Sequence, residues 1–268
     1  MIYVYVIKGL IYIGFGAFVF KGIEALYVYV FKKPIYVHFY VIKKELLSSQ
    51  LRILNQNIDF YRNLDAENKK FFNHRVASFI SNYNFSGREG LKVTEEMKVI
   101  IAGIYVMLTF GLRHYLIKTF DKILIYPEQY YSRLNDTYHI GEYNLGFKAI
   151  VLSWKDVKKG IEIKDDNLNL AIHEFTHALN IHGLRSNDSG ATIFNDTYYE
   201  IIKYVEQPKI SSQLAKSSYF RDYAKTNRFE FFAVILEHFF ESPESFKKEF
   251  PTLYFKVKKM LNFNYAGY

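Results

Sequence analysis

The first thirty residues of the chain are apolar to a degree that no later segment matches. Ile2 to Phe20 is apolar except for Lys8, and Gly22 to Phe31 is apolar except for Glu24. The first of these runs has 19 residues, close to the roughly 20 that a helix needs to cross the hydrocarbon core of a bilayer. The long stem of Lys8 can carry its charge toward the headgroups. The pattern predicts a membrane-anchor helix over residues 1–31, with a buried or interfacial helix as the alternative.

The charges that flank this segment predict its orientation. Almost nothing charged precedes it, whereas four lysines follow it: Lys32, Lys33, Lys43 and Lys44. The apolar run predicts membrane association through residues 2–20. The positive-inside rule then predicts that the body of the protein lies in the cytoplasm. A soluble cytoplasmic protein is the alternative. A secretory signal is disfavoured, because no small-residue cleavage pattern follows the apolar run.

Two stretches of the body have the pattern of helices. Residues 65–83 place Phe72, Val76 and Phe79 at helical spacing among polar residues, which predicts an amphipathic helix. The apolar run from Val99 to Leu112 is too short to span a bilayer comfortably and predicts a buried helix. Thr94 is placed to cap its start, with two glutamates in the first turn.

The middle of the chain has the pattern of short strands. They are expected at Ile123 to Tyr126, Tyr138 to Tyr143 and Ala149 to Trp154, separated by Pro, Asn, Asp and Gly. Beyond Asp166 the helical pattern returns, and Ser242 and Pro243 are placed as cap and first residue of a last helix. The fold class predicted is α+β, with a small mixed sheet and a mostly helical C-terminal half.

Composition narrows the chemistry of any functional site. The chain contains no cysteine, which excludes disulfides, thiolate zinc sites and a cysteine nucleophile. Any metal site must therefore use His, Asp or Glu. The net charge of +8 suits an anionic membrane surface or nucleic acid. Since no nucleic-acid-binding signature accompanies it, no nucleic-acid partner is predicted.

The sequence H-E-F-T-H at residues 173–177 is the strongest chemical signal in the chain. On a helix, His173 and His177 share one face and can bind one Zn²⁺, while Glu174 lies alongside as general base toward a Zn-activated water. The apolar spacing of Leu168, Ile172, Phe175 and Leu179 supports a helix here, with Asp166 or Asn167 as its cap and Gly183 at its end. The other histidines lack ligand spacing, although His182 lies close in sequence.

Catalytic zinc sites usually have three protein ligands, and the third must come from elsewhere in the chain. The helical stretch Asn227 to Glu241 carries Glu230 and Glu237 on a face bordered by bulky apolar residues. Buried carboxylates need a partner. The two lie two turns, about 10.5 Å, apart, so both cannot bind one ion. Glu230 is expected as the metal ligand and Glu237 as a supporting group.

These motifs resemble the zinc peptidases related to Mlc titration factor A, which share an overall fold with gluzincin-type metallopeptidases. The resemblance covers roughly residues 55–260. It rests on F-Y-R-N-L at 60–64, V-T-E-E-M at 93–97, V-L-S-W at 151–154, H-E-F-T-H-A-L at 173–179 and Y-A-K-T-N-R-F-E-F-F-A-V-I-L-E-H-F-F-E at 223–241. It implies a zincin-like peptidase domain over residues 55–268, after a basic connecting segment at 32–54.

The family pattern implies roles for individual residues. It assigns one zinc ion to His173, His177 and Glu230, and an active-site role to Tyr223. Asn180 departs from the pattern, since the family usually has Asp there. The apolar segment before residue 32 is absent from the soluble prototype, whose repressor-binding role we do not extend to this chain.

Two functions compete. The first is a zinc metallopeptidase acting on a peptide or protein substrate, with Glu174 as general base and Tyr223 stabilising the oxyanion. Its strand at Ala149 to Trp154 is expected to pair with extended substrate. The second is a zinc-stabilised regulatory module that sequesters a protein regulator without turnover. Glu174 favours the enzyme, because a binding site has little need of a proton acceptor beside the metal. The sequence leaves aminopeptidase and endopeptidase action open.

Overall fold

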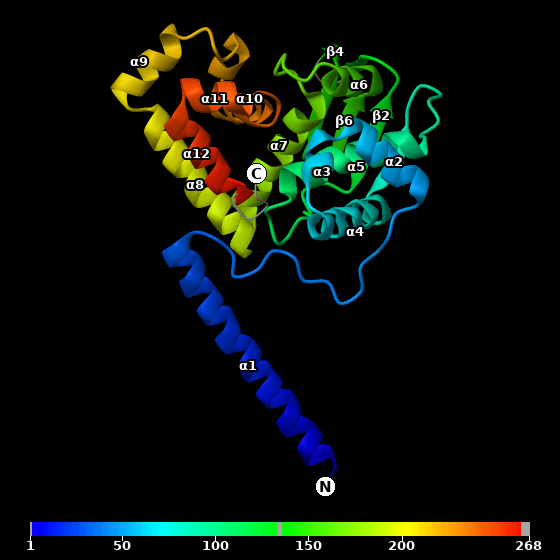
Figure 1. The fold of residues 1–268 in the computed structure, drawn as a ribbon, viewed down its shortest axis with the longest axis vertical. Coiled ribbons are helices and arrows are strands. Elements are labelled where there is room, and N and C mark those ends of the chain that lie inside the picture. Colours follow the sequence, from blue (N-terminus) through cyan, green and yellow to red (C-terminus); the bar gives the residue numbers. More distant parts are fainter. Residues whose placement is uncertain (1, 133–135, 264–268) are drawn as a thin grey trace.

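A computed structural model describes residues 2–132 and 136–263 of the chain. It shows a body of helices around a small sheet, from which the N-terminal helix α1 (Ile2–Phe31) projects on its own (Figure 1). The α+β fold and the N-terminal apolar helix predicted from the sequence are confirmed. Within the described residues, α1 is the one helix that is long and apolar enough to cross a membrane.

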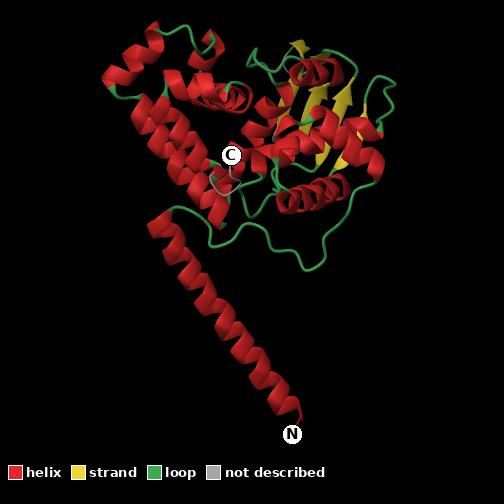
Figure 2. Ribbon diagram, in the orientation of Figure 1, coloured by secondary structure: helices red, strands yellow, loops and turns green. Residues whose placement is uncertain are grey.

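The sheet is mixed, as predicted. Its four strands run in the order β1-β2-β6-β5, and a separate ribbon pairs β3 with β4 (Figure 2). The strands are β1 (Asn84–Gly87), β2 (Lys122–Tyr126), β3 (Tyr130–Ser132), β4 (Thr137–His139), β5 (Gly141–Asn144) and β6 (Ala149–Ser153). β1, β2 and β6 are parallel, whereas β5 runs antiparallel to β6 and forms an edge. All five residues of β6 are buried, as expected for a central strand.

Helices make up most of the rest of the body. They are α2 (Ser48–Asn57), α3 (Asp59–Asn63), α4 (Ala66–Asn82), α5 (Glu95–Thr109), α6 (Trp154–Glu162), α7 (Leu170–Arg185), α8 (Ser189–Val205), α9 (Pro208–Lys216), the 3₁₀ turn η1 (Asp222–Lys225), α10 (Arg228–Glu241), α11 (Pro243–Glu249) and α12 (Pro251–Met260). The predicted helices at 65–83 and 99–112 correspond to α4 and α5. Thr94 caps α5 by accepting a hydrogen bond from the Met97 amide, as predicted.

An aromatic cluster joins the sheet to α4, α5 and α7. Phe79, Tyr105, Phe120 and Phe175 are fully buried, and their ring centroids lie 4.5–6.4 Å apart. These separations match the edge-to-face and offset arrangements that aromatic rings prefer. Phe175 belongs to α7, so the cluster fixes the position of that helix against the core.

Several local expectations were wrong. The strand predicted over residues 138–143 is divided between β4 and β5, which belong to different sheets. α7 is capped by Asn169, whose side chain accepts from the Ile172 amide, and neither Asp166 nor Asn167 takes that place. Gly183 lies inside α7 and does not end the helix. Phe194 packs against this glycine and leaves little room for a larger side chain.

Two further differences concern the ends of elements. Ser242 and Pro243 begin a helix as predicted, but α12 follows it, so it is not the last. α2 crosses the predicted boundary between residues 54 and 55, and Leu54 is fully buried in the core. The division into anchor, connecting segment and peptidase domain stays a prediction.

The aromatic cluster makes a prediction about stability. Phe120→Ala removes a fully buried ring, and we expect it to lower the free energy of unfolding by about 3–5 kcal/mol. The matched control is Phe147→Ala, because this ring is 72% exposed and its loss should change stability by no more than about 0.5 kcal/mol. Chemical denaturation of both variants measures the difference. Equal stabilities would show that the cluster does not support the core.

Candidate metal centre

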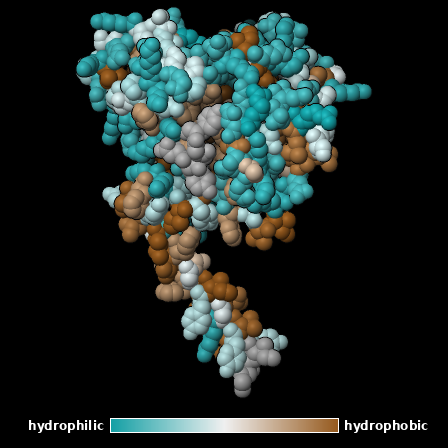
Figure 3. Space-filling model, in the orientation of Figure 1, coloured by the Kyte–Doolittle hydropathy of each residue, from teal (hydrophilic) through white to brown (hydrophobic). Residues whose placement is uncertain are grey.

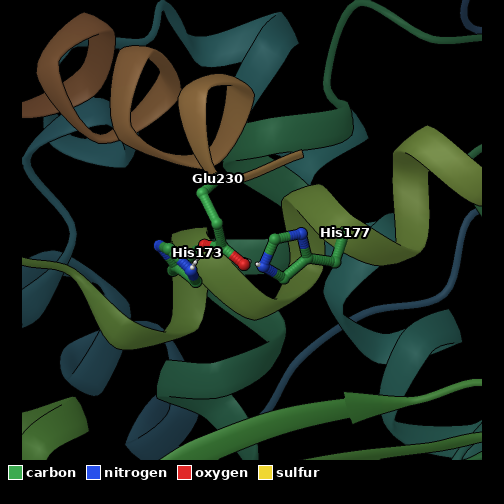
Figure 4. A group of neighbouring side chains, drawn as sticks. All are labelled: His173, His177 and Glu230. Atoms are coloured by element: carbon green, nitrogen blue, oxygen red, sulfur yellow. Dashed lines mark hydrogen bonds and ion pairs between the residues drawn. The ribbon is translucent and has the colours of Figure 1, made fainter. Parts of the chain in front are cut away.

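Helix α7 carries the two histidines of the H-E-x-x-H motif on one face. His173 and His177 are four residues apart, and their ring centroids lie 4.8 Å from each other. His173 is buried, while Phe175 points from the same helix into the aromatic cluster. The helix therefore has one face anchored in the core and one face directed at the site (Figure 4).

Glu230 reaches the two histidines from the first turn of α10. Asn227 caps this helix by accepting from the amides of Phe229 and Glu230, which fixes the turn that carries the carboxylate. Glu230 Oε2 lies 3.0 Å from His173 Nε2 and 3.6 Å from His177 Nε2. One donor atom from each of the three residues falls within 4.8 Å of the others. The structure thus brings together the three residues that the sequence predicted as ligands.

Glu237 supports His173 from the opposite side of the imidazole. Its Oε2 lies 3.6 Å from His173 Nδ1 and 2.7 Å from Arg221 Nη2, and its Oε1 accepts from the Asn169 amide at 3.1 Å. Carboxylates in this position orient metal-binding histidines and raise their basicity. Arg221 was not predicted from the sequence. A buried Glu237 needs a cationic partner, and this need was the signal that could have led to Arg221.

Strand β5 passes very close to Glu174, the residue predicted as general base. A Cβ at residue 141 would lie 2.5 Å from Leu170 Cδ1 and 3.0 Å from Glu174 Oε1, so a larger residue there would have to displace one of these side chains. The backbone N–H of Tyr143 also donates to the Glu174 carboxylate. Glu174 faces a cavity of about 370 Å³ that His173, Arg221 and Glu237 also line.

The charges of the site suit a divalent cation. The carboxyl groups of Glu174, Glu230 and Glu237 lie around the two histidines, and the guanidinium of Arg221 pairs with Glu237. Two imidazole nitrogens and one carboxylate oxygen form the donor set that Zn²⁺ takes in catalytic sites. The residues present therefore fit a bound metal ion.

Burial and neighbouring charges shift the protonation of all three motif residues. Burial disfavours the charged form of His173, but the carboxylates of Glu230 and Glu237 outweigh it and raise its pKa to about 9. Burial and the charge of His173 lower the pKa of His177 to about 4. Burial raises the pKa of Glu174 to about 7, opposed by His173. A carboxyl group with that pKa can both accept and release a proton near neutral pH.

Three other residues were singled out from the sequence, namely Tyr223, His182 and Asn180. The backbone of Tyr223 lies in η1, two residues after Arg221, but its side chain falls outside the described part of the structure. His182 lies at the far end of α7, where its Nε2 is 3.0 Å from Asp188 Oδ2, away from the metal ligands. Asn180 is buried, where a neutral amide costs less than the charge of an aspartate.

Comparisons with known proteins agree with this geometry. An uncharacterised protein of Synechocystis sp. is 26% identical over 224 residues, which cover 77% of this chain and 81% of that protein. Mlc titration factor A of Serratia proteamaculans is 26% identical over 185 residues, covering 62% and 69% of the two chains. Mlc titration factor A of Edwardsiella ictaluri is 28% identical over 180 residues, covering 61% and 68%.

The family assignment comes from a match that spans most of the body. Residues 38–261 match the model of the glucose-regulated metallo-peptidase M90 family. The match includes α2 and all later helices and strands of the sheet, together with the three converging residues. It confirms the resemblance inferred from the motifs: the chain belongs to the glucose-regulated metallo-peptidase M90 family.

Proposed function

We propose that the protein is a zinc-dependent peptidase that hydrolyses peptide bonds. The observation that carries this proposal is the convergence of His173, His177 and Glu230, with Glu174 beside them and a cavity lined by His173 and Glu174. A site for structural zinc would be closed by a fourth protein ligand, whereas three ligands beside a cavity leave room for water and substrate.

The roles of the residues follow from their positions. When bound by His173, His177 and Glu230, Zn²⁺ supplies Lewis-acid polarisation and lowers the pKa of a water molecule. Glu174 accepts a proton from the attacking water and passes it to the leaving amine, which its pKa of about 7 allows. Tyr223, whose backbone belongs to the 3₁₀ turn Asp222–Lys225, is proposed to donate to the oxyanion.

The substrate is proposed to bind along β5, which corrects the expectation for residues 149–154. That segment forms β6, whose two edges are occupied by β2 and β5, so it has no free edge for a peptide. β5 pairs with β6 alone among the described strands and passes over Glu174. An extended peptide that adds to the β5 edge would lie beside the general base.

A second candidate function is binding of a protein regulator without turnover. The name Mlc titration factor A, carried by the relatives from Serratia and Edwardsiella, favours a protein partner of this kind. In that case the metal would stabilise the junction of α7 and α10, and Glu174 would have no proton to transfer.

We further propose that α1 anchors the protein in a membrane with the body in the cytoplasm. Residues Tyr3–Phe31 meet the length and composition of a spanning helix, and none of the most apolar window is buried inside the protein. The lysines that follow the helix favour the cytoplasmic side.

The peptidase mechanism predicts different losses in three variants. Glu174→Gln keeps every metal ligand but removes the proton acceptor, so turnover should fall by about 10² to 10⁴ while metal content persists. Tyr223→Phe should retain metal and lose about 10² to 10³ in turnover. His173→Ala should lose the metal itself. Metal analysis beside a peptide-library digest measures both quantities. Unchanged turnover in Glu174→Gln would exclude the peptidase and favour the regulatory module.

The close approach of β5 to Glu174 predicts a site-specific effect of one methyl group. Gly141→Ala must displace Leu170 or Glu174, so we expect turnover to fall with metal content unchanged. Gly146→Ala is the matched control, because a Cβ there meets only Asn144 Oδ1 at 3.5 Å. The two variants are compared in the same peptidase assay. Equal activities would show that β5 does not constrain the general base.

The proposed topology predicts the behaviour of fusion proteins. A reporter fused to the C-terminus should be active only in forms suited to the cytoplasm, and the protein should stay in membranes washed with salt and alkali. A reporter active only outside the cytoplasm would reverse the orientation. Complete release into the wash would contradict the anchor.

A further inference from the structure

The last turns of α1 are fixed against the body. Val28 is buried, and Glu24 forms an ion pair with Arg113 in which both side chains are largely shielded from water. Just past the helix, Lys32 Nζ lies 2.6 Å from Asp196 Oδ2 in α8. The body therefore holds α1 from Glu24 onward, and the helix leaves the body at a defined place.

The free part of α1 has the length of a bilayer core. Tyr3–Ile23 precedes the Glu24 ion pair and has no buried residue, and near its end Phe20 makes a ring contact with Tyr36 at 6.5 Å between centroids. At 1.5 Å per residue these turns extend for about 31 Å, against a hydrocarbon core of about 30 Å. If this part spans the membrane, the body meets the headgroups directly. No spacer separates the body from the lipid.

The segment of residues 35–47 lies at this end of the body and is held in place from within. In Figure 1 it runs along the underside, where α1 emerges. Val37 is buried, His38 stacks on Phe71 with centroids 4.5 Å apart, and Tyr40 accepts a hydrogen bond at 2.7 Å from the fully buried Arg75. These contacts give the segment a fixed inner face.

The outer face of the same segment is apolar and unprotected. Phe39, Val41 and Ile42 are 72%, 87% and 83% exposed. Figure 3 shows apolar side chains on the underside of the body on the same side as α1. Lys33 and Lys44 are exposed beside them. Adjacent apolar side chains that a fixed backbone holds in water are typical of a binding surface.

We propose that the outer face of residues 35–47 docks on the surface of the bilayer that α1 crosses. Phe39, Val41 and Ile42 enter the boundary between headgroups and acyl chains, and Lys33 and Lys44 contact anionic phospholipid headgroups. The inference rests on the proposed membrane anchor. A bilayer is the occupant that fits, because the exposed length of α1 places lipid at this face and the three lysines of residues 33–47, Lys33, Lys43 and Lys44, outnumber the one glutamate, Glu45.

Docking would also fix the direction in which the metal centre opens. The cavity beside Glu174 is lined by residues of β4, α6 and the start of α7. β4 and α6 lie at the end of the body away from α1 (Figure 1). A docked body therefore presents its cavity to water, which suits soluble polypeptides rather than segments buried in lipid.

Single-cysteine labelling tests the docking, because the chain contains no native cysteine. Ile13→Cys, Ile42→Cys and Ser212→Cys are labelled with a fluorophore in the full chain and reconstituted into vesicles that contain phosphatidylglycerol. Lipids with nitroxides at shallow or deep positions quench each probe. We expect deep quenching at Ile13→Cys, shallow quenching at Ile42→Cys and none at Ser212→Cys, an exposed site on α9.

The probes separate failure of docking from failure of the anchor. Quenching at Ile13→Cys without quenching at Ile42→Cys would overturn the docking and leave the anchor standing. Absence of quenching at Ile13→Cys would contradict the anchor, and the docking with it. If the labelled Ile42→Cys is unquenched, and the unlabelled variant forms disulfide-linked dimers when an oxidant is added, the surface binds a second copy of the chain and the proposal is wrong.

A lysine series tests the electrostatic part of the docking. Lys33→Gln and Lys44→Gln should each weaken docking to anionic vesicles about fivefold, measured as the quenched fraction of the Ile42→Cys probe. Lys209→Gln and Lys216→Gln, two exposed changes on α9, are the matched control and should have no effect. Equal losses in both sets would show that the face has no specific contact with anionic lipid.

Discussion

One imidazole ring connects the two helices that build the metal centre. Glu230 approaches His173 at Nε2 and Glu237 approaches it at Nδ1, and both carboxylates come from α10. Because they lie two helical turns apart, about 10.5 Å, they can reach the same ring only if α10 crosses α7 at this residue. Arg221 compensates the charge of Glu237, so a carboxylate that is almost fully buried keeps a partner. The positions of Glu230 and Glu237 in the site depend on this crossing.

The core and the sheet hold the second half of the site. Phe175 anchors α7 in the aromatic cluster, so the neighbouring Glu174 is held beneath β5. Gly141 removes the side chain that would otherwise separate strand and helix. Glu174 therefore contacts rigid backbone and also lines the cavity. Such an arrangement keeps a buried carboxyl group in place.

The exit of α1 lies at the end of the body opposite β4 and α6, which line the cavity beside Glu174 (Figure 1). α1 is fixed to α8 and to Arg113, whereas β4 and α6 surround the opening of the cavity. Rigid attachment of the helix makes the orientation of the body a property of the fold. A flexible linker would allow the cavity to face any direction. The residues that follow α1 pack on Arg75 and Phe71, so they do not act as such a linker.

The sequence by itself determined the features that depend on local periodicity. The four-residue spacing of His173 and His177 places them on one face of a helix, Thr94 marks the start of α5, and the apolar run identifies α1. Each follows from the geometry of a single element, so no knowledge of its neighbours is needed.

Only the tertiary structure decided which elements meet. The alternation over residues 138–143 could not show that β4 and β5 enter different sheets, nor could the apolar pattern of β6 show that its two edges are paired. Asn169 caps α7 in place of Asp166 or Asn167, because the packing of α6 against α7 decides where the first turn of α7 begins. Partners distant in sequence decide the roles of Arg221, Gly141 and the inner face of residues 35–47. Contacts of this kind depend on how helices cross and strands pair, and a one-dimensional pattern does not contain that information.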